Sequence, residues 1–180
     1  PVGVNKETGD ITNKHSHNST NVWENPTQYN GFKGKVVCAY YGRPEKLEEA
    51  DRICYFMAVY YNCIGTTGVE VNRGETVSNF TKWKALKYLM KDPVELWDSS
   101  IKANVTASYG VNMGGGSGQG TTNVLEGLRL LKEMLYSEVG KKLDGTPLYF
   151  FQTIYDYQSV LELLKWNDKG NFDRVSEMLI

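Results

Sequence analysis

Two short segments near the start of the chain have the composition of strands. Residues 19–24 and 34–41 carry valine and aromatic residues, and residues 25–31 between them contain asparagine, proline and glycine. β-branched and aromatic side chains fit a pleated, half-buried surface, and turn residues of this kind end a strand. We expect two consecutive strands that pair antiparallel. Residues 1–17 are polar and rich in glycine, asparagine and lysine, which indicates a surface loop.

The next segment has the spacing of an amphipathic helix. Its apolar positions recur at intervals of three and four residues, and they are Leu47, Ala50, Cys54, Met57, Ala58 and Tyr61. Pro44 suits the first turn of such a helix, and the glutamates after it complement the positive end of the helix dipole. The same spacing leaves four charged residues largely on the solvent side, namely Glu48, Glu49, Asp51 and Arg52. We therefore predict a helix that opens at Pro44 and reaches Tyr61.

The middle of the chain predicts a strand, a second helix and a loop. Residues 66–71 contain threonine and valine in the pattern of a strand, and a polar turn follows them. Residues 75–90 have a partial helical spacing that stops before Asp92-Pro93, because proline cannot continue a helix. Residues 99–120 show no periodicity and include a glycine run, which predicts a mobile loop.

The C-terminal third is mainly helical by the same criteria. Helical spacing recurs over residues 124–135, 157–166 and 172–180, and residues 143–152 predict a turn and a strand. Strands come first and helices follow with one strand returning, so the predicted class is mixed α/β. A chain of 180 residues with 41% hydrophobic residues has room for one domain with a proper core. We expect residues 1–180 to form that single domain.

Charge and cysteine content narrow the possible functions. The net charge is −1 and the isoelectric point is near 6.2, so the chain lacks the basic field that drives tight, autonomous binding to nucleic acid. Three cysteines without metal-ligand spacing favour a reducing cytosol and no disulfide framework. No segment approaches the roughly 18 apolar residues of a membrane span, and no signal sequence opens the chain. We expect a soluble protein that is not exported and does not bind membranes.

Two acidic residues are candidates for a functional site, and one of them, Glu70, lies at a strand end, where α/β folds tend to build sites. Glu70 lies between Val69 and Val71 near the end of a predicted strand, so the valines should be buried and the glutamate should point to the opposite side. Asp173 lies in the first turn of the last predicted helix, where an acid also stabilises the helix dipole by about 0.3 to 1 kcal/mol. Taken alone, each is more readily explained as an exposed or structural acid than as a ligand.

Three segments resemble one known family. They are VVCAYYGRPE (residues 36–45), VEVNRG (residues 69–74) and LKWNDKGNFDRVSEM (residues 164–178). In this order and spacing they resemble the C-terminal nuclease domain of the large terminase subunit of tailed bacteriophages, and they look most similar to terminases of crAss-like and related Bacteroidetes phages. The resemblance implies a ribonuclease-H-like fold, with a mixed central sheet flanked by helices. It also implies that Glu70 and Asp173 are catalytic metal ligands.

The resemblance further implies an activity and its partners. The expected activity is endonucleolytic cleavage of concatemeric double-stranded DNA in the cytoplasm of a bacterial host. The expected cofactors are two Mg²⁺ or Mn²⁺ ions, which prefer carboxylate oxygens and act about 3.5 to 4 Å apart in such sites. Implied partners are double-stranded DNA, an N-terminal ATPase motor domain that this chain lacks, the small terminase subunit and the portal protein.

The family pattern includes a third acid at the end of a first strand. No apolar strand precedes Pro1 in this sequence, so we expect that acid to lie before Pro1. Within the chain, Glu7, Asp10 and Asp51 are the alternatives, and the first two lie in loop-like sequence.

Basic residues near strand ends and on the second helix are candidate DNA contacts. They are Arg43, Arg73, Lys82 and Lys84, and Lys87 lies on the same predicted helix. A solvated helix face explains the lysines better than DNA contact does, and Arg73, three residues from Glu70, is the better candidate for a phosphate contact. The glycine run lacks the lysine and threonine of a nucleotide-binding loop, so it does not indicate ATP binding.

Two other functions fit the same residues. One is a non-catalytic domain that binds DNA or protein, in which the acids are only surface charge. The other is a resolvase-like nuclease, which would share the site and differ in its substrate.

Overall fold

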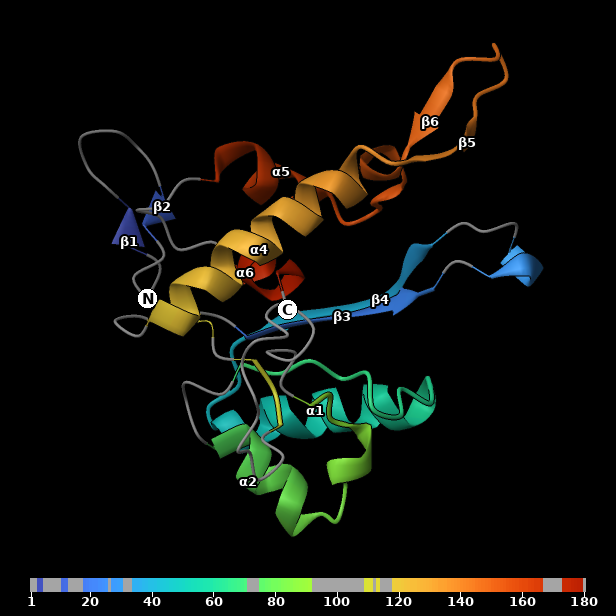
Figure 1. The fold of residues 1–180 in the computed structure, drawn as a ribbon. Helices are drawn as coiled ribbons and strands as arrows, with labels where there is room; N and C mark the ends of the chain where they lie inside the picture. The colour runs from blue at the N-terminus through green and yellow to red at the C-terminus, as the bar shows by residue number, and fades with distance from the viewer. Residues whose placement is uncertain are drawn as a thin grey trace.

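An antiparallel strand pair forms the middle of the fold in the computed structural model of the chain (Figure 1). Strand β3 (Asn18–Glu24) pairs with β4 (Lys35–Gly42), from Asn18 opposite Gly42 to Glu24 opposite Lys35. Exposed and partly buried residues alternate along most of β4, as expected for a strand with one covered face. A short 3₁₀ turn, η1 (Gln28–Asn30), lies in the connection. The sequence prediction of two antiparallel strands is confirmed.

The structure describes residues 3–4, 11–12, 18–25, 27–30, 34–70, 75–91, 109–111, 113, 118–166 and 173–179. Within this part the chain is mixed α/β, as predicted. The N-terminal segment differs from the predicted loop, because β1 (Gly3–Val4) and β2 (Ile11–Thr12) pair antiparallel. Glu7, Asp10 and Arg73 lie outside the described residues.

Helices lie on both sides of the β3–β4 pair (Figure 1). Helices α1 (Leu47–Tyr60) and α2 (Glu75–Lys82) pack together on one side. On the other side, α6 (Asp173–Met178) packs on β3 and on α5 (Tyr157–Lys165). The helices predicted at residues 157–166 and 172–180 are therefore present, and the helix predicted from Pro44 begins at Leu47.

Helix α2 is shorter than the helix predicted over residues 75–90. Lys84 adopts a left-handed backbone conformation with φ of 55°. The Ala85 N–H donates to Phe80 O over 2.8 Å, and the Lys84 N–H donates to Thr81 O over 3.0 Å. These paired bonds close the helix end in a Schellman motif. The chain then makes a 3₁₀ turn, η2 (Leu86–Tyr88), so the prediction of one continuous helix is wrong.

A buried hydrophobic cluster beside α1 and α2 anchors the segment that carries Glu70. Its buried members are Val69, Phe80, Ala85 and Leu89. The segment pairs with two different neighbours, since Thr67 bridges to Leu89 and Glu70 bridges to Val111, both in parallel. Because each neighbour contributes a single bridge, residues 66–70 do not form a continuous strand, although the composition of residues 66–71 predicts one. Val69 is buried, as predicted, and Val71 lies outside the described residues.

The C-terminal half contains a long helix and a hairpin. Helix α4 (Gly118–Leu135) begins inside the segment predicted as a loop, so the prediction for Gly118–Gly120 is wrong. Strands β5 (Glu138–Lys141) and β6 (Pro147–Tyr149) form a hairpin that projects beyond the end of α4 (Figure 1), and η3 (Phe150–Thr153) follows. The described strands form three two-stranded antiparallel sheets. No helix in the described part is long and apolar enough to cross a membrane.

Candidate functional site

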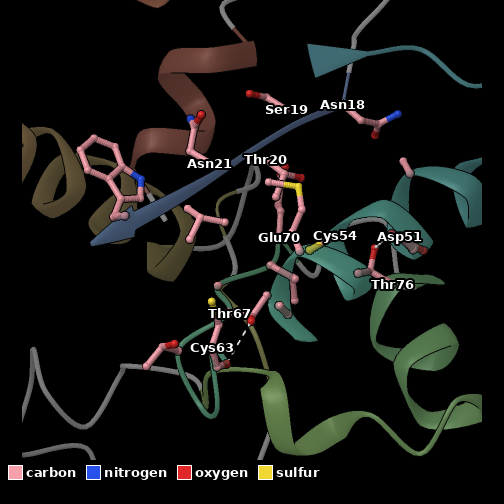
Figure 2. Close-up of a pocket in the computed structure, with 18 of the residues that line it drawn as sticks. Asn18, Ser19, Thr20, Asn21, Asp51, Cys54, Cys63, Thr67, Glu70 and Thr76 are labelled. Carbon is pink, nitrogen blue, oxygen red and sulfur yellow. Dashed lines mark hydrogen bonds between the residues drawn. The ribbon is translucent and has the colours of Figure 1, made fainter. Parts of the chain in front are cut away.

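A pocket of about 370 Å³ lies between β3, α1 and the segment that carries Glu70 (Figure 2). The residues that line it include the acids Asp51 and Glu70 and the cysteines Cys54 and Cys63. The described residues that line it include no lysine, arginine or histidine. The described lining residues are therefore acidic, neutral polar or apolar.

Backbone contacts on both sides fix Glu70 at this pocket. The buried side chain of Val69 anchors the segment in the core, and the Val111 N–H donates to Val69 O over 2.8 Å. Glu70 itself is partly buried and lies between β3 and α1 (Figure 2). The backbone before Glu70 is thus held by the core and by this hydrogen bond, and a ligand or catalytic acid needs support of this kind.

Helix α6 brings its part of the chain to the same pocket. The helix begins at Asp173, and Ser176 and Met178 further along it line the pocket wall. Val175 is 1% exposed and anchors the helix in the core. The position of the Asp173 side chain lies outside the described part of the structure. The fold therefore joins the helix of Asp173 to the pocket of Glu70, although 103 positions separate the two residues in the sequence.

Asp51 was predicted on the solvent side of α1, and this prediction is wrong. The residue is 5% exposed, and Thr76 Oγ1 and Asn79 Nδ2 donate to its carboxylate over 2.9 and 2.7 Å. A buried carboxylate is tolerated only with such donors, because burial of an unpartnered charge is very costly. The sequence signal was its place in the stripe formed by Leu47, Asp51, Cys54 and Ala58, which repeats at intervals of three and four.

The hydrogen-bond network of Asp51 reaches the surface of α2. Lys82 Nζ donates to Asn79 Oδ1 over 3.2 Å, and Asn79 in turn donates to Asp51. Lys82, a predicted DNA contact, is thus also tied to the wall of the pocket. Arg43 and Lys84 are exposed, the first after β4 and the second after α2.

Some of the side chains at the pocket have the chemistry of ligands for a hard cation, and others do not. Carboxylate oxygens of Glu70 and Asp51 are the ligands that Mg²⁺ and Mn²⁺ prefer. Burial raises the pKa of the Cys63 thiol, so this group stays protonated at neutral pH and is a poor ligand. Within the described ranges, no three His, Cys, Asp or Glu side chains gather closely enough to hold a metal ion. Of the described lining residues, Glu70 could therefore supply one ligand of such an ion, because the Asp51 carboxylate already accepts from Thr76 and Asn79.

No protein-family model, curated protein sequence or solved structure matches this chain. The described part of the structure defines a mixed α/β chain with an acidic pocket between its strand pair and its first helix.

Proposed function

We propose that the chain is the metal-dependent nuclease domain of a viral DNA-packaging terminase, with a ribonuclease-H-like fold. One observation carries the proposal: Glu70 lines a pocket that is also lined by α6, the helix that begins at Asp173. The terminase resemblance pairs these two acids, and the fold brings the two segments to one pocket. Double-stranded DNA is the proposed substrate. The ATPase motor domain, the small subunit and the portal are the proposed partners in the bacterial cytoplasm.

In this function Glu70 and Asp173 would hold Mg²⁺ or Mn²⁺ at the pocket. The chemistry that such ions would supply is activation of a water molecule and stabilisation of the leaving oxygen of the phosphodiester. The described lining is compatible with a need for ions, because it includes two acids, and a metal ion would attract the phosphate that these acids repel. Asp51 has hydrogen bonds from Thr76 and Asn79, so its role in this scheme is to hold α1 and α2 in place.

Cleavage of supercoiled plasmid in a Mn²⁺ titration tests the proposal. We expect Glu70→Gln and Asp173→Asn to lower the nicking rate at least about 100-fold. Loss of a residue that supports a metal ligand commonly costs about 10- to 100-fold, and loss of the ligand itself should cost more. Glu48→Gln is the matched control, since Glu48 is exposed on α1 and forms a surface ion pair with Arg52. Nicking that survives both substitutions would contradict the assignment of Glu70 and Asp173 as metal ligands.

A non-catalytic domain that binds DNA or protein is the second candidate. The observation in its favour is that Asp51, the other acid among the lining residues, accepts from Thr76 and Asn79 as a structural carboxylate does. The two functions differ in metal binding as well as in cleavage. A non-catalytic domain should show no Mn²⁺ binding that depends on Glu70 and Asp173, whereas the nuclease should show it even without DNA.

A further inference from the structure

The second residue of α6, Arg174, contacts three residues outside its own helix. Its Nε lies 3.2 Å from Asp156 Oδ2, and its Nη1 lies 3.0 Å from Glu162 Oε1. The backbone N–H of Arg174 donates to Glu162 Oε2 over 3.0 Å. Its guanidinium carbon lies 3.5 Å from the centre of the Tyr41 ring on β4. The side chain is 14% exposed, so solvent screens these contacts less than it screens a surface ion pair.

The partners of Arg174 are themselves held in place. Asp156 caps the N-terminus of α5 by accepting from the Gln158 N–H over 3.1 Å, and Ser159 Oγ also donates to it. Glu162 lies within α5 and is 20% exposed. A guanidinium suits this arrangement, because its planar fork can donate to two carboxylates while its face stacks on an aromatic ring. A lysine has neither the fork nor the planar face.

Helix α6 depends on such contacts for its position. It has only 6 residues, and an isolated helix shorter than about 12 to 15 residues is marginal in water. Val175 fixes one side of the helix in the core, and Arg174 ties its start to α5 and β4. The next residues, Ser176 and Met178, line the pocket. A shift of Arg174 would therefore move the start of the helix relative to the pocket.

We propose that Arg174 is a positioning residue, which fixes the backbone of Asp173 relative to Glu70 by tying α6 to α5 and β4. This inference rests on the proposed function, because it assigns to Arg174 the geometry of that site. Metal affinity depends strongly on ligand placement, and loss of a supporting contact commonly lowers it about 10- to 100-fold. An arginine that only stabilised the fold would leave the metal affinity of the folded protein unchanged.

The test measures Mn²⁺ binding to the purified chain from the electron paramagnetic resonance signal of the free ion, with folding followed by circular dichroism. For Arg174→Lys we expect a folded protein with about tenfold weaker Mn²⁺ affinity. Saturating Mn²⁺ should restore most of its nicking rate. Glu162→Gln, which keeps the shape of the partner and removes its charge, should shift the affinity in the same direction.

Arg129 provides the matched control. It also pairs with two carboxylates, those of Glu126 and Glu133, but all three lie on α4 and Arg129 is 52% exposed. Arg129→Lys should keep the original Mn²⁺ affinity.

The outcomes separate this inference from the proposed function. If Arg174→Lys and Glu162→Gln are folded and keep the original Mn²⁺ affinity, the positioning role is overturned and the nuclease proposal stands. If Arg174→Lys does not fold, Glu162→Gln decides: weaker affinity supports the inference and unchanged affinity overturns it. If the chain binds no Mn²⁺, or if Glu70→Gln and Asp173→Asn leave its affinity unchanged, the proposed function fails and this inference fails with it.

Discussion

At the scale of single residues, two non-glycine residues end helices in a left-handed backbone conformation that is usually taken by glycine. Asn62 and Lys84 have φ of 56° and 55°, and both occupy the C′ position of a Schellman motif. After α1, the Cys63 N–H donates to Ala58 O over 2.9 Å and the Asn62 N–H donates to Val59 O over 3.2 Å. Asparagine tolerates this region well, whereas lysine has no local hydrogen bond to offset the steric cost. The end of α2 therefore stores more backbone strain than the end of α1.

Replacement of these residues by glycine should reveal that difference. We expect Lys84→Gly to raise the free energy of unfolding by about 0.5 to 1 kcal/mol, after the greater entropy of glycine in the unfolded chain is subtracted from the relieved strain. Asn62→Gly should give a smaller gain. Urea denaturation measures both. Ser78→Gly, at an exposed position within α2, is the control and should lower stability by about 0.5 kcal/mol. A loss for Lys84→Gly equal to that of the control would contradict the strain argument.

At the scale of elements, α4 and the end of the chain approach each other closely at Gly127. A Cβ placed on this residue would lie 2.8 Å from Leu179 O and 3.1 Å from Leu179 Cβ. Both atoms belong to, or are directly attached to, the backbone just after α6, so neither can move as a flexible side chain would. Gly127 thus sets the spacing between α4 and the segment that follows the helix of Asp173.

Gly127→Ala should lower the stability of the protein, whereas replacement of glycine by alanine usually raises the stability of a helix. Alanine usually stabilises a helix over glycine by roughly 0.5 to 1 kcal/mol. Here we expect a loss of about 1 to 3 kcal/mol, because overpacking forces the backbone apart. Thermal unfolding measures the change. Leu125→Ala, at a side chain on α4 that is 64% exposed, should change stability by less than about 0.5 kcal/mol. An increase in stability for Gly127→Ala would show that the two segments can separate freely.

At the scale of the whole molecule, net charge limits the affinity that the chain can have for DNA without a partner. The net charge is −1, and the described lining of the pocket has no basic residue. Binding to duplex DNA draws most of its affinity from lysine and arginine contacts with phosphates, which release counterions. If the chain is the proposed nuclease, weak DNA affinity of its own would suit a motor that moves DNA without cutting it, since other parts of the packaging machine would deliver the substrate.

Duplex DNA should therefore bind weakly at physiological salt. We expect a dissociation constant of about 1 μM or weaker at about 0.15 M salt, measured by fluorescence anisotropy with a labelled duplex. Arg43→Ala and Lys84→Ala should reduce the dependence of binding on salt concentration. Lys35→Ala is the control, since Lys35 already pairs with Glu24 across the strands. Tight binding at this salt concentration would contradict the view that the DNA is delivered by a partner.

Local patterns in the sequence were sufficient for several elements. The composition of residues 19–24 and 34–41 predicted β3 and β4, and apolar spacing predicted α1 and α5 within a few residues. These predictions work because strand and helix periodicity depends on residues two to four positions apart. The early end of α2 was missed because Lys84 takes a backbone conformation that lysine seldom adopts.

The sequence by itself determined the mixed α/β class, the order of the main elements and the two acids worth testing. Only the tertiary structure decided that Asp51 is buried, because its donors Thr76 and Asn79 lie 25 and 28 positions away. It also decided that α6 reaches the pocket of Glu70 and that Arg174 binds α5 and β4. Periodicity reports which face of one element is apolar. It does not report which distant element covers that face, because packing in three dimensions sets those contacts.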